Sequence, residues 1–158
     1  MVDGDQARVV LVLSPFKNGW CDLALKIADE RFVFRSISYT TDVLGDLLRF
    51  ALALAVGCAA TECSFDQETT ELRLRGVSDT VNADIRVYKF ASIFNNQPVE
   101  QGERVFLARC TVDAFARASI SVAETMLNSL GEAGYKSEWR VDFPHRPLVA
   151  LKAVLASP

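Results

Sequence analysis

The sequence predicts an α+β domain, with an antiparallel β-sheet of about six to seven strands and helices packed mainly on one face. Short segments of period two fall in two runs, one on each side of an apolar helix, so strands and helices do not alternate. That order is typical of α+β proteins. The 158 residues, half of them hydrophobic and 23% charged, suit a single domain over 1–158 with its own core.

Three strands are expected first, at 7–13, 21–28 and 31–39. "ARVVLVL" is a short β-branched run, which favours a buried strand. "CDLALKIA" alternates apolar and polar residues, as a strand with one buried face does. "RFVFRSISY" carries apolar groups on both faces, and we therefore expect it to lie centrally in the sheet.

The most apolar stretch, "LLRFALALAVGCAA" at 47–60, predicts a buried helix. Its longest uninterrupted apolar run has 11 residues, whereas a membrane span needs about 20. Thr41 or Asp42 is expected to cap the start of this helix, and Gly57 to end it. Either the C-terminal segment or a second chain must cover its far side, and we favour the C-terminal segment.

Only a narrow stripe of this helix is polar, formed by Asp42, Asp46 and Arg49, and the rest is almost entirely apolar. We therefore expect a second element to pack on the side of the helix that faces away from the sheet. The remaining predicted elements follow the helix in chain order. They are a hairpin over 60–65 and 70–75, strands over 81–90 and 104–110, a long loop over 91–103, a long helix over 111–130, an irregular linker over 135–147 and a short helix over 147–156.

Charge and cysteine content exclude several classes of protein. The net charge of −3 and a pI near 5.2, without any Lys/Arg run, argue against a nucleic-acid binder. The N-terminal segment has no basic region and does not resemble a secretory signal. Four scattered cysteines with no Cys-x-x-Cys pair indicate buried thiols. We expect a cytoplasmic protein that neither binds nucleic acid nor enters a membrane.

No motif in the chain predicts a catalytic or metal site. A zinc site needs three or four suitable ligands, and His145 is the only histidine. "GEAGYKS" at 131–137 superficially resembles a phosphate-binding loop, but Tyr135 separates its glycine from Lys136. We therefore expect no enzyme activity, no metal and no cofactor.

Candidate partner-binding residues come from three features of the sequence. A cluster of carboxylates surrounds one predicted hairpin, the 91–103 loop carries exposed polar groups, and both tryptophans lie near predicted loops. The candidates are Glu62, Asp66, Glu68, Glu71, Phe94, Asn95, Asn96, Glu100, Trp20 and Trp139. The alternatives are a solvated turn for the acidic residues and edges of the core for the tryptophans.

Two segments carry a resemblance to known proteins. "SYTTDVLGDLLRFALALAVG" at 38–57 and "GEAGYKSEWRVDFPHRPLVAL" at 131–151 resemble segments of small uncharacterised bacterial α+β proteins of about this length. Those proteins often look like immunity or accessory proteins. The resemblance implies a bacterial, cytosolic protein and transfers no catalytic residue.

The leading functional hypothesis is a non-enzymatic protein-binding module, and more specifically a bacterial immunity protein that neutralises a cognate toxin. Its partner would be basic if the acidic hairpin makes the contact. One alternative is a homo-oligomer, such as a homodimer, that joins through the 47–56 helix or a sheet edge. The other is an enzyme or small-ligand binder with a pocket between the sheet and the helices.

Overall fold

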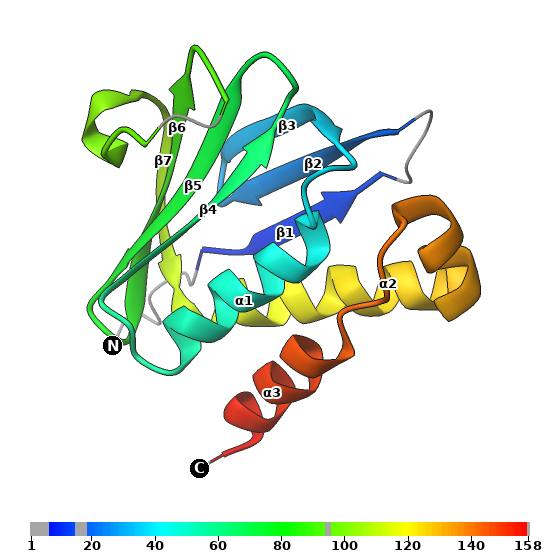
Figure 1. Ribbon diagram of the computed structural model, residues 1–158. Coiled ribbons are helices and arrows are strands. Elements are labelled where there is room, and N and C mark those ends of the chain that lie inside the picture. The colour runs from blue at the N-terminus through cyan, green and yellow to red at the C-terminus, as the bar shows by residue number, and fades with distance from the viewer. Residues whose placement is uncertain (1–6, 15–18, 94–95, 158) are drawn as a thin grey trace.

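The computed structural model describes residues 7–14, 19–93 and 96–157 and confirms the α+β class. In chain order the elements are β1 (Val9–Leu13), β2 (Trp20–Ile27), β3 (Glu30–Ser38), α1 (Val43–Ala55), β4 (Ala60–Asp66), β5 (Glu71–Ser78), β6 (Asn82–Phe90), the 3-10 helix η1 (Val99–Gln101), β7 (Glu103–Thr111), α2 (Val112–Trp139) and α3 (His145–Ala156). Figure 1 shows the helices gathered on one side of the strands.

The strands form two antiparallel sheets, so the prediction of one sheet with six to seven strands is wrong. One sheet has the order β1-β2-β3 and the other β4-β5-β6-β7. Short turns join β2 to β3, β4 to β5 and β5 to β6, a longer segment with η1 joins β6 to β7, and α1 separates β3 from β4. The two sheets meet through aromatic side chains, with Phe34 of β3 5.1 Å from Phe65 of β4 between ring centroids. β3 is an edge strand rather than a central one.

Helix α1 is covered on several sides by the protein itself. It packs against α2, α3, β4 and β5, which confirms that the C-terminal segment covers the far side of the apolar stretch. The Asp42 carboxylate accepts a hydrogen bond from the Gly45 amide and caps the start of the helix. Gly57, at φ +96°, closes the other end, with its amide donating to the Leu54 carbonyl.

The polar stripe of α1 is tied together by one cation. The Arg49 guanidinium lies 2.9 Å from Asp42 and 2.8 Å from Asp46. Partial burial raises the pKa of Asp46 despite this pairing. The stripe holds the charged groups of a helix whose other side chains are buried or partly buried.

Gly76 of β5 lies directly against two side chains of α1. A Cβ at this position would lie 2.9 Å from Cζ of Phe50 and 3.2 Å from Cδ2 of Leu54. Gly76→Ala is therefore expected to lower the free energy of unfolding by about 1–3 kcal/mol through overpacking, as measured by urea denaturation. The control is Gly134→Ala, where the nearest atom lies 3.4 Å away. It should be neutral or stabilising, and equal losses in both variants would contradict this account.

Helix α2 continues past its predicted end. Gly131 leaves helical geometry at φ 68° and ψ 171°, but the chain returns to a helix that ends at Trp139. The predicted irregular linker over 135–147 is therefore wrong at its start, and α3 begins at His145 rather than Pro147. The helices have 13, 28 and 12 residues, so there is one long helix and two shorter ones instead of two long and one short.

Candidate functional site

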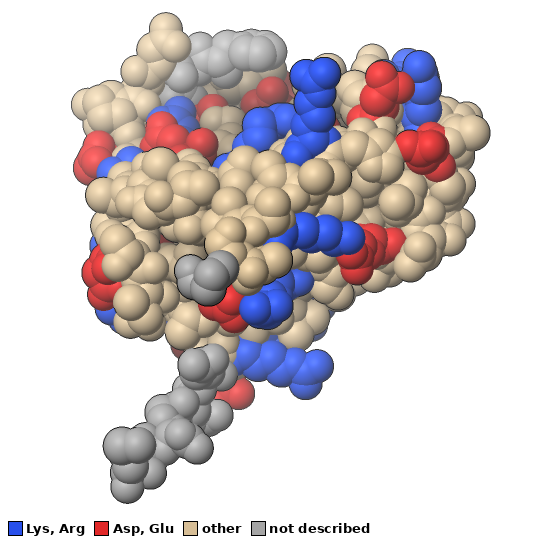
Figure 2. Space-filling view, turned by 90° about the horizontal axis from the view of Figure 1, so that it is seen from below, with Lys and Arg blue, Asp and Glu red and all other residues tan. Residues whose placement is uncertain are grey.

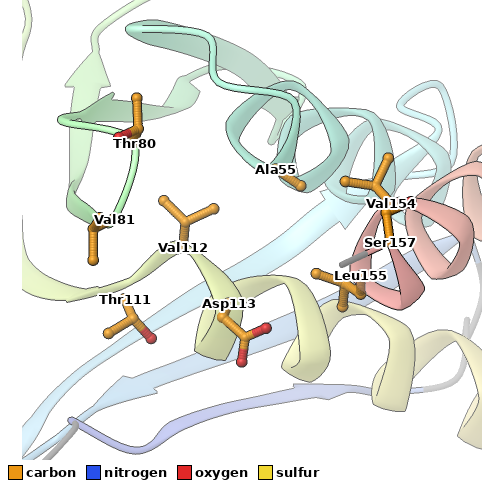
Figure 3. Close-up of a pocket in the computed structure, with 9 residues that line it drawn as sticks. All are labelled: Ala55, Thr80, Val81, Thr111, Val112, Asp113, Val154, Leu155 and Ser157. Atoms are coloured by element: carbon orange, nitrogen blue, oxygen red, sulfur yellow. The ribbon is translucent and has the colours of Figure 1, made fainter.

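A hollow lies where the three helices meet a turn of the second sheet. It measures about 480 Å³. Figure 3 shows the β5–β6 turn on one side, the ends of α1 and α3 on the other, and the start of α2 between them. Its lining is Ala55, Thr80, Val81, Thr111, Val112, Asp113, Val154, Leu155 and Ser157.

The lining is chiefly aliphatic, with short hydroxyl groups and one carboxylate. The carboxylate, Asp113, already pairs with Arg117 at 2.8 Å. The Thr111 hydroxyl accepts the Ala114 amide as the cap of α2. These polar groups therefore serve the helix that they begin. The hollow thus offers a ligand both apolar and polar surface, with the apolar share somewhat larger.

The β5–β6 turn holds Val81 outward at the rim of this hollow. Thr80 adopts φ +80°, a conformation that β-branched residues rarely take and that costs about 1–3 kcal/mol. The Asp79 carboxylate accepts hydrogen bonds from the Val81 and Asn82 amides, which lower its pKa. The Val81 carbonyl in turn accepts the Val112 amide at 2.9 Å. A strained and well-bonded turn thus fixes an apolar side chain that is 64% exposed.

Sequence reasoning missed this hollow. Its residues come from four segments far apart in the chain, and no motif joins them. The one usable signal was the turn itself, where an Asp-Thr pair precedes an apolar residue. Figure 2, which views the molecule from the helical side, shows uncharged residues over much of this face, with charged side chains scattered among them.

The acidic hairpin carries less free charge than its sequence suggests. Glu62 pairs with Arg75 at 3.1 Å. Glu71 is buried and pairs with Arg73 at 2.8 Å. Asp66 is half-buried, and both burial and the Glu71 charge raise its pKa. Glu68 remains exposed in the turn.

The loop between β6 and β7 folds back over the outer face of the second sheet. Phe94 and Asn95 lie outside the described residues. Asn96 and Glu100 are exposed, while Val99 forms a small buried cluster with Tyr88 and Phe90. The loop therefore combines an exposed polar side with an apolar side that covers the sheet.

The two tryptophans differ in their surroundings. Trp139 is 2% exposed and stacks in parallel on Tyr135, with ring centroids 5.3 Å apart. Trp20 begins β2 and is half-buried. Trp139 and Glu71 thus offer no surface to a partner in this structure, whereas the other described candidates are at least partly exposed. The structure does not gather them with the hollow.

In the part of the chain that the structure describes, the buried cysteine thiols and His145 lack the surroundings of a catalytic nucleophile and its base. Burial raises the pKa of Cys21 and of Cys110 to about 12, and that of Cys63 well above its usual value. Since the thiolate is the nucleophile, these thiols are unreactive at neutral pH. His145 contacts Glu132 beside Phe143, at a hollow of about 340 Å³ whose described lining contains no thiol or serine.

Within the described residues, no three His, Cys, Asp or Glu side chains come together in a way that could hold a metal ion. Among the helices described, none is both long and apolar enough to cross a membrane. Comparison with known proteins gave no significant match to a protein family, a curated protein or a solved structure.

Proposed function

We propose that this chain is a non-enzymatic protein-binding module that receives an apolar side chain of its partner in the hollow between the β5–β6 turn and the helix ends. The observation that carries the proposal is the strained turn that holds Val81 at the rim. Local strain is retained where the surrounding structure over-determines it, and such sites cluster at ligand contacts. The β2–β3 and β4–β5 turns also place a non-glycine residue at positive φ, Ala28 and Glu68, but of the three only Thr80 is β-branched and therefore strongly strained there.

The chemistry of the hollow supports a side chain as its occupant. At about 480 Å³ it has room for one or two large apolar groups. Protein interfaces draw most of their binding free energy from a few apolar or aromatic anchors that fill such sites. Exposed aliphatic residues extend the surface, with Val81 at 64% and Val56, next to the lining residue Ala55, at 60% exposure.

The finer proposal is an immunity protein whose partner is a bacterial toxin. The resemblance of the 38–57 and 131–151 segments supports it. Charge steering by the acidic hairpin would rest mainly on Asp66 and Glu68, because Glu62 and Glu71 are paired with arginines. The hollow is therefore the better anchor, and the hairpin a peripheral contact.

Val81→Asp is expected to weaken the partner complex at least tenfold, because it places a charge in an apolar contact. The partner is first isolated by affinity purification of the tagged chain from its native host, and Kd is then measured by calorimetry. Val149→Asp is the matched control: Val149 is 63% exposed on α3 and does not line the hollow. It should change Kd less than threefold.

Three results would contradict the proposal. One is the recovery of no specific partner, together with no toxin gene beside this one. Another is a partner whose Kd is unchanged by Val81→Asp. The third is a homo-oligomer in light scattering that Val81→Asp leaves intact, which would favour the structural alternative. For that alternative, the packing of α3 on α1 leaves the sheet edges and the exposed end of the 47–56 segment, at Val56, as candidate surfaces.

A further inference from the structure

A second surface, which shares no residue with the hollow at the β5–β6 turn, lies on the outer face of the β1-β2-β3 sheet. Alternation sends Leu23, Leu25 and Ile27 into the core. The opposite face bears Val12, which is 57% exposed, and the exposed side chains of Lys26 and Arg31. This exposure means that none of the described helices or strands covers Val12, Lys26 or Arg31.

The register places two like charges directly opposite each other on this face. Lys26 pairs with Arg31 across β2 and β3, and Val10 pairs with Lys26 across β1 and β2. Neither cation forms an ion pair with any residue that the structure describes. Like charges in opposed positions of a sheet are destabilising, so this arrangement is kept at the expense of stability.

The two cations border an apolar hollow. It measures about 330 Å³ and is lined by Val10, Val12, Ala24, Lys26, Asp29 and Arg31. On the strands around it, the exposed Arg8 and Arg35 add positive charge. The carboxylates here are Asp29, in the lining, and Asp22, which pairs with Arg35 at 3.9 Å. A chain with a net charge of −3 thus presents one sheet face on which cations outnumber carboxylates.

We propose that this face binds an acidic protein segment in which carboxylate side chains alternate with aliphatic ones. The carboxylates meet Lys26 and Arg31, and an aliphatic side chain enters the hollow over Val10, Val12 and Ala24. Charge complementarity of this kind sets partner choice and steers association. The segment is a second ligand, and its binding does not depend on the occupant of the other hollow.

Nucleic acid and membrane fit this face less well. A nucleic-acid groove combines more extensive positive charge with exposed aromatic rings for base stacking, whereas the described lining of this hollow contains no aromatic ring and one carboxylate, that of Asp29. Binding in a membrane interface needs a large apolar face rich in Trp, Phe or Leu. Three small aliphatic side chains between cations instead match a peptide with short apolar groups.

The test uses a fluorescein-labelled peptide of four Glu-Val repeats, titrated with the full chain at 50 mM salt and followed by fluorescence anisotropy. The Glu-Val peptide should bind saturably, at least tenfold tighter than a Lys-Val peptide and at least threefold tighter than a Glu-Ser peptide. Parallel arms use a twelve-nucleotide single-stranded DNA and vesicles of phosphatidylcholine with 30% phosphatidylserine. If the chain bound the DNA or the vesicles more tightly than the Glu-Val peptide, the proposal would be overturned.

Arg31→Glu separates a binding role from a structural one. The substitution converts the Lys26–Arg31 pair into an opposite-charge pair, so Tm should stay the same or rise. Affinity for the Glu-Val peptide should nevertheless fall at least tenfold. Val81→Asp, on the other surface, should leave this affinity unchanged. Undiminished binding by Arg31→Glu, or no saturable binding by the unaltered chain, would overturn the proposal without affecting the proposed function of the first hollow.

Discussion

Arg73→Ala is expected to lower the free energy of unfolding by about 3–5 kcal/mol, because it leaves a buried carboxylate without its arginine. The Arg73 and Glu71 side chains are 8% and 6% exposed and lie 2.8 Å apart. Arg73 also donates to the Gln97 carbonyl at 2.8 Å and lies 4.3 Å above the Phe90 ring. One side chain thus holds the 96–102 segment onto the outer face of the second sheet.

Arg75→Ala is the matched control for this loss. Arg75 lies on the same strand and face, but its pair with Glu62 is partly exposed, so we expect a loss below about 1 kcal/mol. The double variant Glu71→Leu/Arg73→Met removes both buried charges and should lose less than Arg73→Ala. Urea denaturation measures all three. Equal losses for Arg73→Ala and Arg75→Ala would show that burial of the pair does not matter.

The Glu71–Arg73 pair also shows what a sequence pattern can and cannot determine. Alternation along β5 correctly places these two residues on the face opposite Leu72 and Leu74. It does not reveal that a distant segment covers that face. That segment reaches this face at the Gln97 carbonyl, which accepts from Arg73, and at Gly102, where a Cβ would lie 2.7 Å from Phe90. Contacts of this kind are not encoded in local periodicity.

Local signals predicted the helices and strands better than their arrangement. The order of three strands, a helix, four strands and two helices follows from apolar periods and from caps such as Asp42 and Gly57. Pairing between strands is a long-range property, and nothing local distinguishes one seven-stranded sheet from sheets of three and four. Gly131 was a misleading signal for the end of the long helix that was predicted over 111–130. A single glycine at positive φ can interrupt a helix that then resumes.

The candidate site was the least predictable part. The hollow exists because the β5–β6 turn, the start of α2 and the ends of α1 and α3 converge, and each contributes ordinary Val, Ala, Leu or Thr residues. By contrast, two of the four acidic residues that stood out in the hairpin, Glu62 and Glu71, are paired with arginines of β5. Residue type alone therefore overstated the free negative charge of the hairpin and did not reveal the hollow.

Trp139→Ala is expected to lower the free energy of unfolding by about 3–5 kcal/mol, which distinguishes a core residue from a partner anchor. Trp139 fills the core at the end of α2, stacked on Tyr135, whose ring also meets Phe143 edge-on at 5.2 Å. Removing the indole would leave a cavity on one face of the Tyr135 ring. Trp139→Phe keeps an aromatic ring there and should lose less.

Trp20→Ala is the control for Trp139→Ala, because it removes the other tryptophan from a less buried position. Trp20 is half-buried at the start of β2, so less apolar surface is lost and the destabilisation should be clearly smaller. Folded Trp139→Phe protein should bind the isolated partner with unchanged affinity, since the side chain offers no surface. If Trp139→Phe instead weakened the complex while leaving the denaturation midpoint unchanged, the α2 end would have to open on binding. Trp139 would then be an anchor that the free protein keeps covered.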